Sequence, residues 1–240
     1  MTDTRTRWSS DPYPDFNAEV NSSIAFSGLT VDYLTRRKAT VLMKLASSIL
    51  GASNIKSLDV GCGIANIHRF LGGSLGRLYG VDVSQDAVDR AARANPSVSY
   101  KVYGGSRLPF DDSFFDFCYS ICVLHHVAPA NWLNFLLEMH RVTKTSGLVA
   151  IIEHNPLNPL TLSAVNRCSF DHDAVLLRGS RVKSLLGRVG FEDVRCRYML
   201  FTPFRGSWAE RLDDFFWFLP AGAQYLVSAR KPDPSKPPQE

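Results

Sequence analysis

The sequence predicts an α/β fold with a doubly wound, seven-stranded sheet, mostly parallel with an antiparallel edge strand, and helices on both faces. Three observations predict it. Short apolar runs alternate with helical patterns from Lys56 onward, as in βαβ units. A glycine turn, "DVGCGIAN", follows the first apolar run directly. An aromatic segment, rather than a standard crossover, separates the last two runs, which indicates antiparallel pairing at one edge.

Seven apolar runs predict the strands. They are "SLDV", "RLYGVD", "VSYKVY", "FDFCYS", "LVAIIE", "EDVRCRYMLF" and "AQYLVSARK". A helix over "QDAVDRAARA" is predicted to begin after Ser84, whose side chain is a good N-cap. In a second helical pattern the apolar residues recur at i, i+3, i+4 and i+7, at Trp132, Phe135, Leu136 and Met139. Both helices are expected to pack on the sheet.

The chain divides into three expected parts. Residues 1–55 are expected to form an N-terminal helical cap around "LTRRKATVLMKLASSIL", with packing on the outside of the sheet as the alternative. Residues 56–231 are expected to form the sheet domain, with an aromatic insertion over 203–221. Residues 232–240, "PDPSKPPQE", are expected to be a disordered tail.

Composition narrows the class of protein. No run of 18 apolar residues occurs, so a cytoplasmic protein without membrane insertion is expected, as a monomer or homodimer. The net charge is +4 without a clustered basic face, so no nucleic acid is expected as partner, and "TRRK" is interpreted as the solvated face of a helix. The five cysteines are scattered, so we expect neither disulfides nor a metal site.

A carboxylate, Asp59, precedes the glycine turn. Ligands of doubly wound sheets bind at the carboxyl ends of the strands, where Asp59 and Gly61 are expected. The pyrophosphate of a dinucleotide would meet the like charge of Asp59, and the third glycine of such sites is replaced by Asn66. S-adenosylmethionine has no phosphate and carries a sulfonium and an ammonium group. The carboxylate therefore favours S-adenosylmethionine.

A second carboxylate, Asp82, ends the second predicted strand. An acidic residue at this place commonly accepts hydrogen bonds from the ribose hydroxyls of a nucleoside ligand. The alternative is a charge that helps the next helix to begin. We expect the ribose contact, because Ser84 already serves as the cap.

Four motifs in order resemble the class I methyltransferases that use S-adenosylmethionine, specifically the methyltransferase type 11 group. They are "LDVGCGIAN", "GVDVSQDAVDRA", "LPFDDSFFDFCYSICVLHHV" and "MHRVTKTSGLVAIIEHNPLNP". The resemblance covers roughly Lys56 to Pro159 and implies a Rossmann-like sheet. Two segments outside this range, "NSSIAFSG" and "LPAGAQYLVSARK", resemble a subgroup associated with glycan or secondary-metabolite pathways.

The resemblance also implies positions around the cofactor. It places the methionine end at Asp59, Gly61, Cys62 and Gly63, the ribose at Asp82, the adenine near Val83, Ser106 and Leu108, and the sulfonium near Ser120 and Ile121. Where relatives carry an aspartate for the adenine amino group, this chain has Gly104. Either a backbone group or Ser106 replaces it, or the adenine is held less specifically.

Methyl transfer needs an aligned nucleophile and, for a hydroxyl acceptor, a group that removes its proton. The candidate bases are His125 and His126 after the fourth strand and His154 after the fifth. The alternative is a structural hydrogen bond for one of the adjacent pair. Acceptor binding is predicted for Tyr33, Glu153, Asn155 and Asn158, with turn formation as the alternative for the asparagines before proline.

The sequence therefore predicts an S-adenosylmethionine-dependent methyltransferase that methylates an oxygen or nitrogen of a small molecule. The alternative is non-methyl alkyl transfer, or an intramolecular cyclisation that releases methylthioadenosine, because no single acceptor base is compelling. A nicotinamide-dependent oxidoreductase is disfavoured by Asp59 and Asn66. A non-catalytic binding protein is disfavoured because the cofactor motifs are intact.

Overall fold

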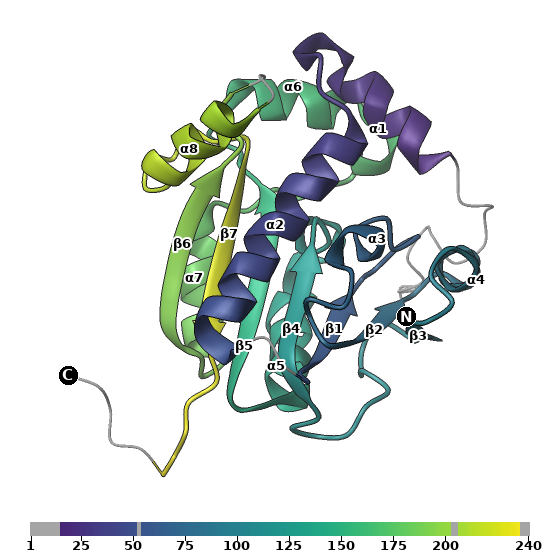
Figure 1. Ribbon diagram of the computed structural model, residues 1–240, viewed down its shortest axis with the longest axis vertical. Coiled ribbons are helices and arrows are strands. Elements are labelled where there is room, and N and C mark those ends of the chain that lie inside the picture. Colours follow the sequence, from purple (N-terminus) through teal and green to yellow (C-terminus); the bar gives the residue numbers. More distant parts are fainter. Residues whose placement is uncertain (1–14, 52–53, 203–205, 236–240) are drawn as a thin grey trace.

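A computed structural model describes residues 15–51, 54–202 and 206–235 of the chain (Figure 1). Its strands form one seven-stranded sheet in the order β3-β2-β1-β4-β5-β7-β6. The strands are β1 (Lys56–Val60), β2 (Arg77–Asp82), β3 (Ser99–Val102), β4 (Phe115–Ile121), β5 (Thr143–His154), β6 (Glu192–Met199) and β7 (Gln224–Arg230). All seven predicted strands are therefore present.

The pairing of the strands confirms the predicted fold class. Within the group β3-β2-β1-β4-β5, every pair of adjacent strands is parallel. β7 lies between β5 and β6 and pairs antiparallel with both, so the antiparallel pairing is at this edge of the sheet. The chain runs outward from β1 to β3 and then returns to β4 on the other side of β1. Ligands of such sheets bind at this reversal, beyond the carboxyl ends of β1 and β4.

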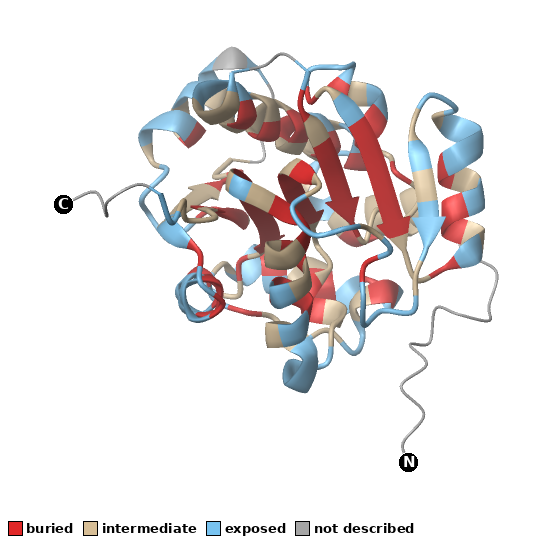
Figure 2. Cartoon of the chain, turned by 90° about the horizontal axis from the view of Figure 1, so that it is seen from below, coloured by how far each residue is buried: buried red, intermediate tan, exposed pale blue. Residues whose placement is uncertain are grey.

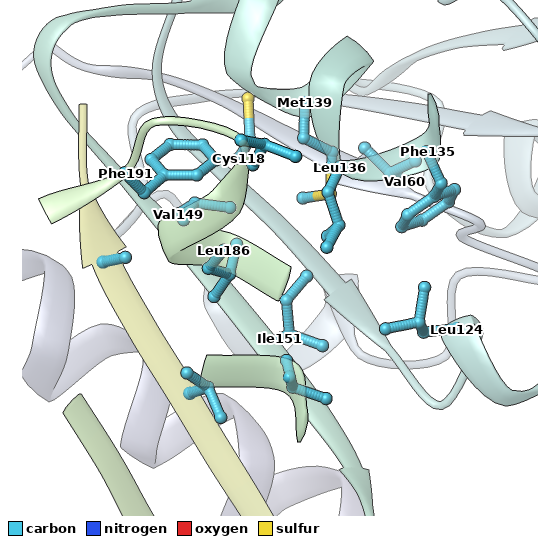
Figure 3. Close-up of a cluster of buried hydrophobic side chains, with 14 of the residues drawn as sticks. Val60, Cys118, Leu124, Phe135, Leu136, Met139, Val149, Ile151, Leu186 and Phe191 are labelled. Carbon is cyan, nitrogen blue, oxygen red and sulfur yellow. The ribbon is translucent and has the colours of Figure 1, made fainter. Parts of the chain in front are cut away.

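Helices lie on both faces of the sheet. They are α1 (Phe16–Ile24), α2 (Val31–Leu50), α3 (His68–Leu71), α4 (Gln85–Ala94), α5 (Trp132–Val142), α6 (Pro159–Arg167), α7 (Gly179–Arg188) and α8 (Ser207–Phe215). Short 3₁₀ turns include η3 (Leu124–His126) and η5 (Ser169–Asp171). Helices α5 and α7 contribute Leu136 and Leu186 to one apolar cluster (Figure 3). The other cluster lies beneath α2 and α3 and includes Leu42 and Leu71.

The central strands are buried on both sides (Figure 2). In β5, Val149 and Ile151 belong to the cluster of α5 and α7, whereas Ala150 and Ile152 belong to the cluster of α2. Successive side chains of a strand point to opposite faces, so a strand covered on both faces needs an unbroken apolar run. This requirement explains the run "LVAII".

The predicted helix in the N-terminal segment is α2, and it packs on the sheet with Ala39, Leu42 and Ala46 buried. The interpretation of "TRRK" as a solvated face was wrong for Arg37, which is only 5% exposed. Its guanidinium donates to Asp213 at 2.8 Å and pairs with Glu210 at 3.0 Å, both on α8. Arg37 is buried because α8, far along the chain, covers it.

Breaking this ion pair should destabilise the fold. Arg37→Ala leaves the Asp213 carboxylate, 5% exposed, without its cation. A buried charge that loses its partner typically costs about 3–5 kcal/mol of unfolding free energy. Urea unfolding followed by circular dichroism measures it, and Arg36→Ala on the exposed side of α2 is the matched control, with a change below about 1 kcal/mol. Equal losses of unfolding free energy in the two variants would contradict a stabilising ion pair between Arg37 and Asp213.

Two predicted segments are described in part. The aromatic insertion over 203–221 contains α8, and residues 203–205 lie outside the described residues. The predicted disordered tail is described only over 232–235, where Asp233 accepts a hydrogen bond from the Ser146 hydroxyl at 3.3 Å. Among the described residues, no helix has the length and apolar character needed to cross a bilayer.

Candidate cofactor and acceptor site

The glycine turn after β1 is shaped by close contacts. Gly61 has a φ of +78°, and its N–H donates to the carbonyl of Val81 at 2.8 Å. A Cβ atom at this position would lie 2.6 Å from the Cγ2 atom of Val123, in the loop after β4. Only glycine fits both the left-handed conformation and this contact. The turn therefore lies directly against the loop that leads to the adjacent histidines.

Asp82 connects the glycine turn to the next helix. Its Oδ2 atom accepts the N–H of Gly63 at 2.8 Å, and its Oδ1 atom accepts the N–H of Ser84 at 3.0 Å. Burial raises the pKa of this carboxyl group, and the hydrogen bonds from Ser84 and Gly63 oppose that effect. Ser84 in turn caps α4, as predicted. The carboxylate thus lies at the end of β2, against the glycine turn.

Asp59 has a partner that the sequence did not reveal. It is 2% exposed, and its Oδ2 atom lies 3.0 Å from the Nε2 atom of His68. The other ring nitrogen of His68 lies 2.7 Å from the hydroxyl of Tyr100, and the hydroxyl of Tyr119 is 3.3 Å from Nε2. The carboxylate beside the turn is therefore fixed by a buried polar network. Its predicted contact with the cofactor remains a proposal.

The residues predicted beside the adenine differ in exposure. Leu108 is buried and Ser106 is exposed, while Val83 is half-buried after β2. A Cβ atom at Gly105 would lie 3.6 Å from the side chain of Val83, so this loop passes beside that residue. Gly104 is exposed, and a Cβ atom there would meet nothing within 4 Å among the described residues.

The predicted residues of β4 lie at the reversal of the sheet. Ser120 is completely buried, and its hydroxyl donates to the carbonyl of Val60 at 2.9 Å, which ties β4 to β1. Ile121 is half-buried at the carboxyl end of β4. Cys122 follows with a φ of +55°, and its N–H donates to the carbonyl of Ile152. The chain therefore turns sharply here, toward η3.

The candidate bases converge with an aspartate that sequence reasoning missed. We call His125, His126, His154 and Asp171 the histidine cluster. The Oδ1 atom of Asp171 lies 3.3 Å from Nε2 of His125 and 3.4 Å from Nε2 of His126. The ring centroids of His125 and His154 are 5.2 Å apart. The cluster joins η3, the end of β5 and η5.

Glu153 orients the cluster from within. It is 1% exposed, and its Oε2 atom lies 2.5 Å from Nδ1 of His125. Its Oε1 atom accepts the N–H groups of Val123 and Leu124 at 3.0 and 2.7 Å. These contacts fix the start of η3. Glu153, predicted to bind the acceptor, thus contacts His125 and the backbone directly.

The three imidazoles differ in charge. Burial alone would lower the pKa of His125, but the charge of Glu153 and the hydrogen bonds to Asp171 and Glu153 outweigh it, so its pKa lies well above the ordinary value. Burial and the charge of His125 lower the pKa of His126 to about 4. Burial and the same charge lower the pKa of His154 to about 4. His126 and His154 are therefore neutral at physiological pH.

The two asparagines form turns, as the alternative interpretation states. Asn155 is completely buried, and its amide donates to the carbonyls of Pro220 and Gly222 at 3.0 and 2.8 Å. Asn158 caps α6 by accepting the first N–H groups of that helix. Tyr33 is half-buried in the first turn of α2. The asparagines thereby hold the turn before β7 beside the end of β5.

Helix α1 bridges the two halves of the site. The Oδ1 atom of Asn17 accepts the side-chain amide of Asn66, in the glycine turn, at 2.7 Å. The Oε1 atom of Glu19 accepts the N–H of Ser169, at the start of η5, at 2.9 Å. Figure 1 shows α1 beside α6 at this end of the molecule. These contacts tie α1 to the glycine turn and to η5, while a role of this segment as a cap remains a proposal.

Comparison with known proteins shows which family this chain resembles. Residues 58–151 match the profile of a family described as a methyltransferase domain. The chain is 31% identical over 144 residues to an uncharacterized methyltransferase of Synechocystis sp., a match that covers 58% of this chain and 68% of that protein. It is 36% identical over 112 residues to a demethylmenaquinone methyltransferase of Staphylococcus epidermidis, and this match covers 44% of the chain and 46% of the relative.

A solved structure shows the same fold. A methyltransferase from Archaeoglobus fulgidus, described as S-adenosylmethionine-dependent, superposes with a TM-score of 0.66 over 90% of this chain and 100% of that one, at 14% identity. From the family profile, the relatives and the fold together, the chain belongs to the methyltransferase type 11 group of class I methyltransferases and is a transferase whose cofactor is S-adenosylmethionine.

Proposed function

We propose that this enzyme methylates an oxygen or nitrogen atom of a small-molecule acceptor held at the histidine cluster. The observation that carries the proposal is the position of the cluster. It lies after β4 and β5, while the glycine turn follows β1, and β1, β4 and β5 are adjacent in the sheet. A cofactor at the turn and an acceptor at the cluster would meet across the sheet reversal.

The proposed cofactor contacts follow the shape of the turn. The backbone of Gly61 and Gly63 approaches the methionine end, with Asp59 behind it, and Asp82 accepts the ribose hydroxyls. A carboxylate has about four lone-pair positions, so Asp82 can hold the N–H groups of Gly63 and Ser84 and still accept from a ligand. The sulfonium then lies toward the end of β4 and η3.

The proposed base is His126. Both ring nitrogens of His125 already face carboxylates, at 2.5 and 3.3 Å, so its imidazole has no free lone pair for an acceptor. The side chain of His126 is 28% exposed and can reach a bound molecule. Asp171, beside it, would stabilise the imidazolium that forms when the proton moves.

Exposed apolar side chains in the chain segment that leads to the end of β5 support an acceptor with an apolar body. The end of α8 and the residues after it expose Phe215, Trp217 and Phe218. The same segment leads to the turn at 220–222, which Asn155 holds beside the end of β5. Demethylmenaquinone, which the name of one matched relative specifies, is itself a small molecule. Large exposed apolar groups that gather at one place commonly mark a binding surface.

A screen of acceptors tests the proposal. Purified enzyme is incubated with S-adenosylmethionine and single candidate hydroxyl or amine compounds, and the products are separated by mass spectrometry. S-adenosylhomocysteine and an acceptor heavier by one methylene are expected. Methylthioadenosine in place of S-adenosylhomocysteine would contradict methyl transfer and support the alkyl-transfer alternative.

Removing the contacts of α1 should reduce turnover. The double substitution Asn17→Ala and Glu19→Ala deletes the two hydrogen bonds that hold α1 over the site. Each such bond contributes about 0.5–1.5 kcal/mol, so the loss of both should lower turnover roughly 5- to 150-fold if the closed arrangement is the active one. The control Asp89→Ala removes an exposed hydrogen bond with Gln85 on the surface of α4. Equal turnover in both variants would show that α1 only packs on the molecule.

A further inference from the structure

We propose that His125, His154 and Asp171 together bind a divalent metal ion of the zinc type. One ligand atom from each residue lies within 4.8 Å of the other two. The three side chains come from η3, the end of β5 and η5, which are held by backbone and side-chain hydrogen bonds. Two imidazoles and a carboxylate form a donor set that zinc and its first-row neighbours prefer over magnesium or calcium.

The spacing between the donors favours a shared ion. A direct hydrogen bond between a charged imidazole and a carboxylate is about 2.7–2.9 Å long. The Nε2 atom of His125 and the Oδ1 atom of Asp171 are 3.3 Å apart. Two ligands bound to one tetrahedral zinc ion, each at about 2.0–2.2 Å, lie about 3.4 Å from one another. The separation of this pair is close to that of two ligands on one ion, and the ligand atom of His154 lies within 4.8 Å of both, so a modest approach of that side chain would complete the site.

The surroundings of His125 fit a zinc ligand. Metal-binding histidines commonly present one ring nitrogen to the ion and the other to a carboxylate, which fixes the tautomer and the ring orientation. Glu153 lies 2.5 Å from Nδ1 of His125, opposite the nitrogen that faces Asp171. Glu153 itself is held by the N–H groups of Val123 and Leu124. This arrangement aims Nε2 of His125 at the proposed ion, which would displace the proton that this nitrogen otherwise shares with Asp171.

The side-chain amide of Gln224 can orient His154 as Glu153 orients His125. The Nε2 atom of the Gln224 side chain lies 3.4 Å from Nδ1 of His154, and the Oε1 atom of Gln224 is buried without a hydrogen-bond partner in the described part of the chain. The two ends of an amide differ only in their assignment. With the amide rotated by 180°, Oε1 would accept a hydrogen bond from the Nδ1–H group of His154. The Nε2 atom of His154 would then carry the lone pair that a metal ion requires.

Three protein ligands leave a fourth position for water or for an oxygen of the acceptor. The ring of His126 lies beside it, with its centroid 4.1 Å from that of His125. A hydroxyl bound to the ion would lose its proton more easily, which would assist methylation of an oxygen acceptor. This role of the ion rests on the proposed function, whereas binding of the ion does not.

Calorimetry with ZnCl₂ tests the site. The full chain, without a histidine tag and stripped with a chelator, should bind one equivalent of Zn²⁺. Asp171→Asn, which keeps the shape of the side chain, should weaken binding at least roughly 10- to 100-fold. His154→Ala should do the same from another segment, so the test survives if one variant does not fold. His172→Ala, an exposed histidine next to Asp171, is the matched control and should bind zinc as the unaltered chain does.

Two results would overturn the site. One is no zinc binding by the folded chain. The other is binding that Asp171→Asn and His154→Ala leave intact, which would place the ion elsewhere. The same samples are titrated with S-adenosylhomocysteine, so the two proposals are separated. A chain that binds zinc but not S-adenosylhomocysteine would contradict the proposed function and leave the metal site standing.

Discussion

Replacing His126 by alanine should lower turnover roughly 100- to 10,000-fold, the usual effect of losing a general base. The expectation follows from the arrangement of the cluster. His125 is held between Glu153 and Asp171, whereas the side chain of His126 is 28% exposed beside them. Steady-state release of S-adenosylhomocysteine with a saturating acceptor measures the effect. The affinity for S-adenosylhomocysteine should be nearly unchanged, because no proposed cofactor contact includes His126.

His172→Ala is the matched control, because it changes an exposed histidine next to Asp171 in the sequence and should keep full turnover. If His126→Ala also keeps near-full turnover, proton removal belongs to His154 or is not needed. An amine acceptor that arrives neutral would then explain the reaction better than a hydroxyl.

Replacing Asp82 by alanine should weaken the binding of S-adenosylhomocysteine by about 10- to 100-fold or more. A hydrogen bond to a charged group contributes about 1.5–3 kcal/mol, and the ribose offers two hydroxyls. The substitution also removes the carboxylate that holds the N–H groups of Gly63 and Ser84, so the shape of the turn changes with it. Calorimetric titration gives the affinity, and thermal unfolding shows that the variant is folded.

Asp86→Ala is the matched control for this carboxylate. Asp86 lies in the first turn of α4 and pairs with Arg90 on the surface of that helix, outside the glycine turn. The loss of Asp86 should leave the affinity for S-adenosylhomocysteine within about twofold, because Asp86 makes no proposed contact with the cofactor. Exposed pairs of this kind contribute only about 0.3–0.5 kcal/mol to the stability of a helix. An unchanged affinity in Asp82→Ala would show that this carboxylate only helps α4 to begin.

The sheet and the glycine turn were predictable because their signals are local. The alternating burial of β5 requires an unbroken apolar run, and the run "LVAII" shows it. Ser84 was recognised as the cap of α4 from the helical pattern that follows it. The antiparallel pairing of β7 was predictable from the missing crossover before it. These features depend on residues close together in the sequence.

Most of the contacts that were missed depend on residues far apart. Arg37 is buried because it pairs with Asp213, which is 176 residues away. Asp171 joins the histidines from 46 residues beyond His125, and the "FDHD" segment that holds it matches no catalytic motif. His68 lies only nine residues after Asp59, but the glycine turn between them brings the two side chains together, and no periodic pattern indicates that contact. These side chains meet only in the folded chain, so no local sequence pattern indicated the pairs.

A crystal structure of the protein with S-adenosylhomocysteine would show where the cofactor lies relative to the histidine cluster. The ribose hydroxyls are expected on Asp82, the methionine end at the backbone of Gly61 and Gly63, and the sulfur directed toward η3 and the histidine cluster. A ligand that avoids the glycine turn would contradict the cofactor site. A ligand at the turn whose sulfur points away from His126 and His154 would contradict the proposed place of methyl transfer.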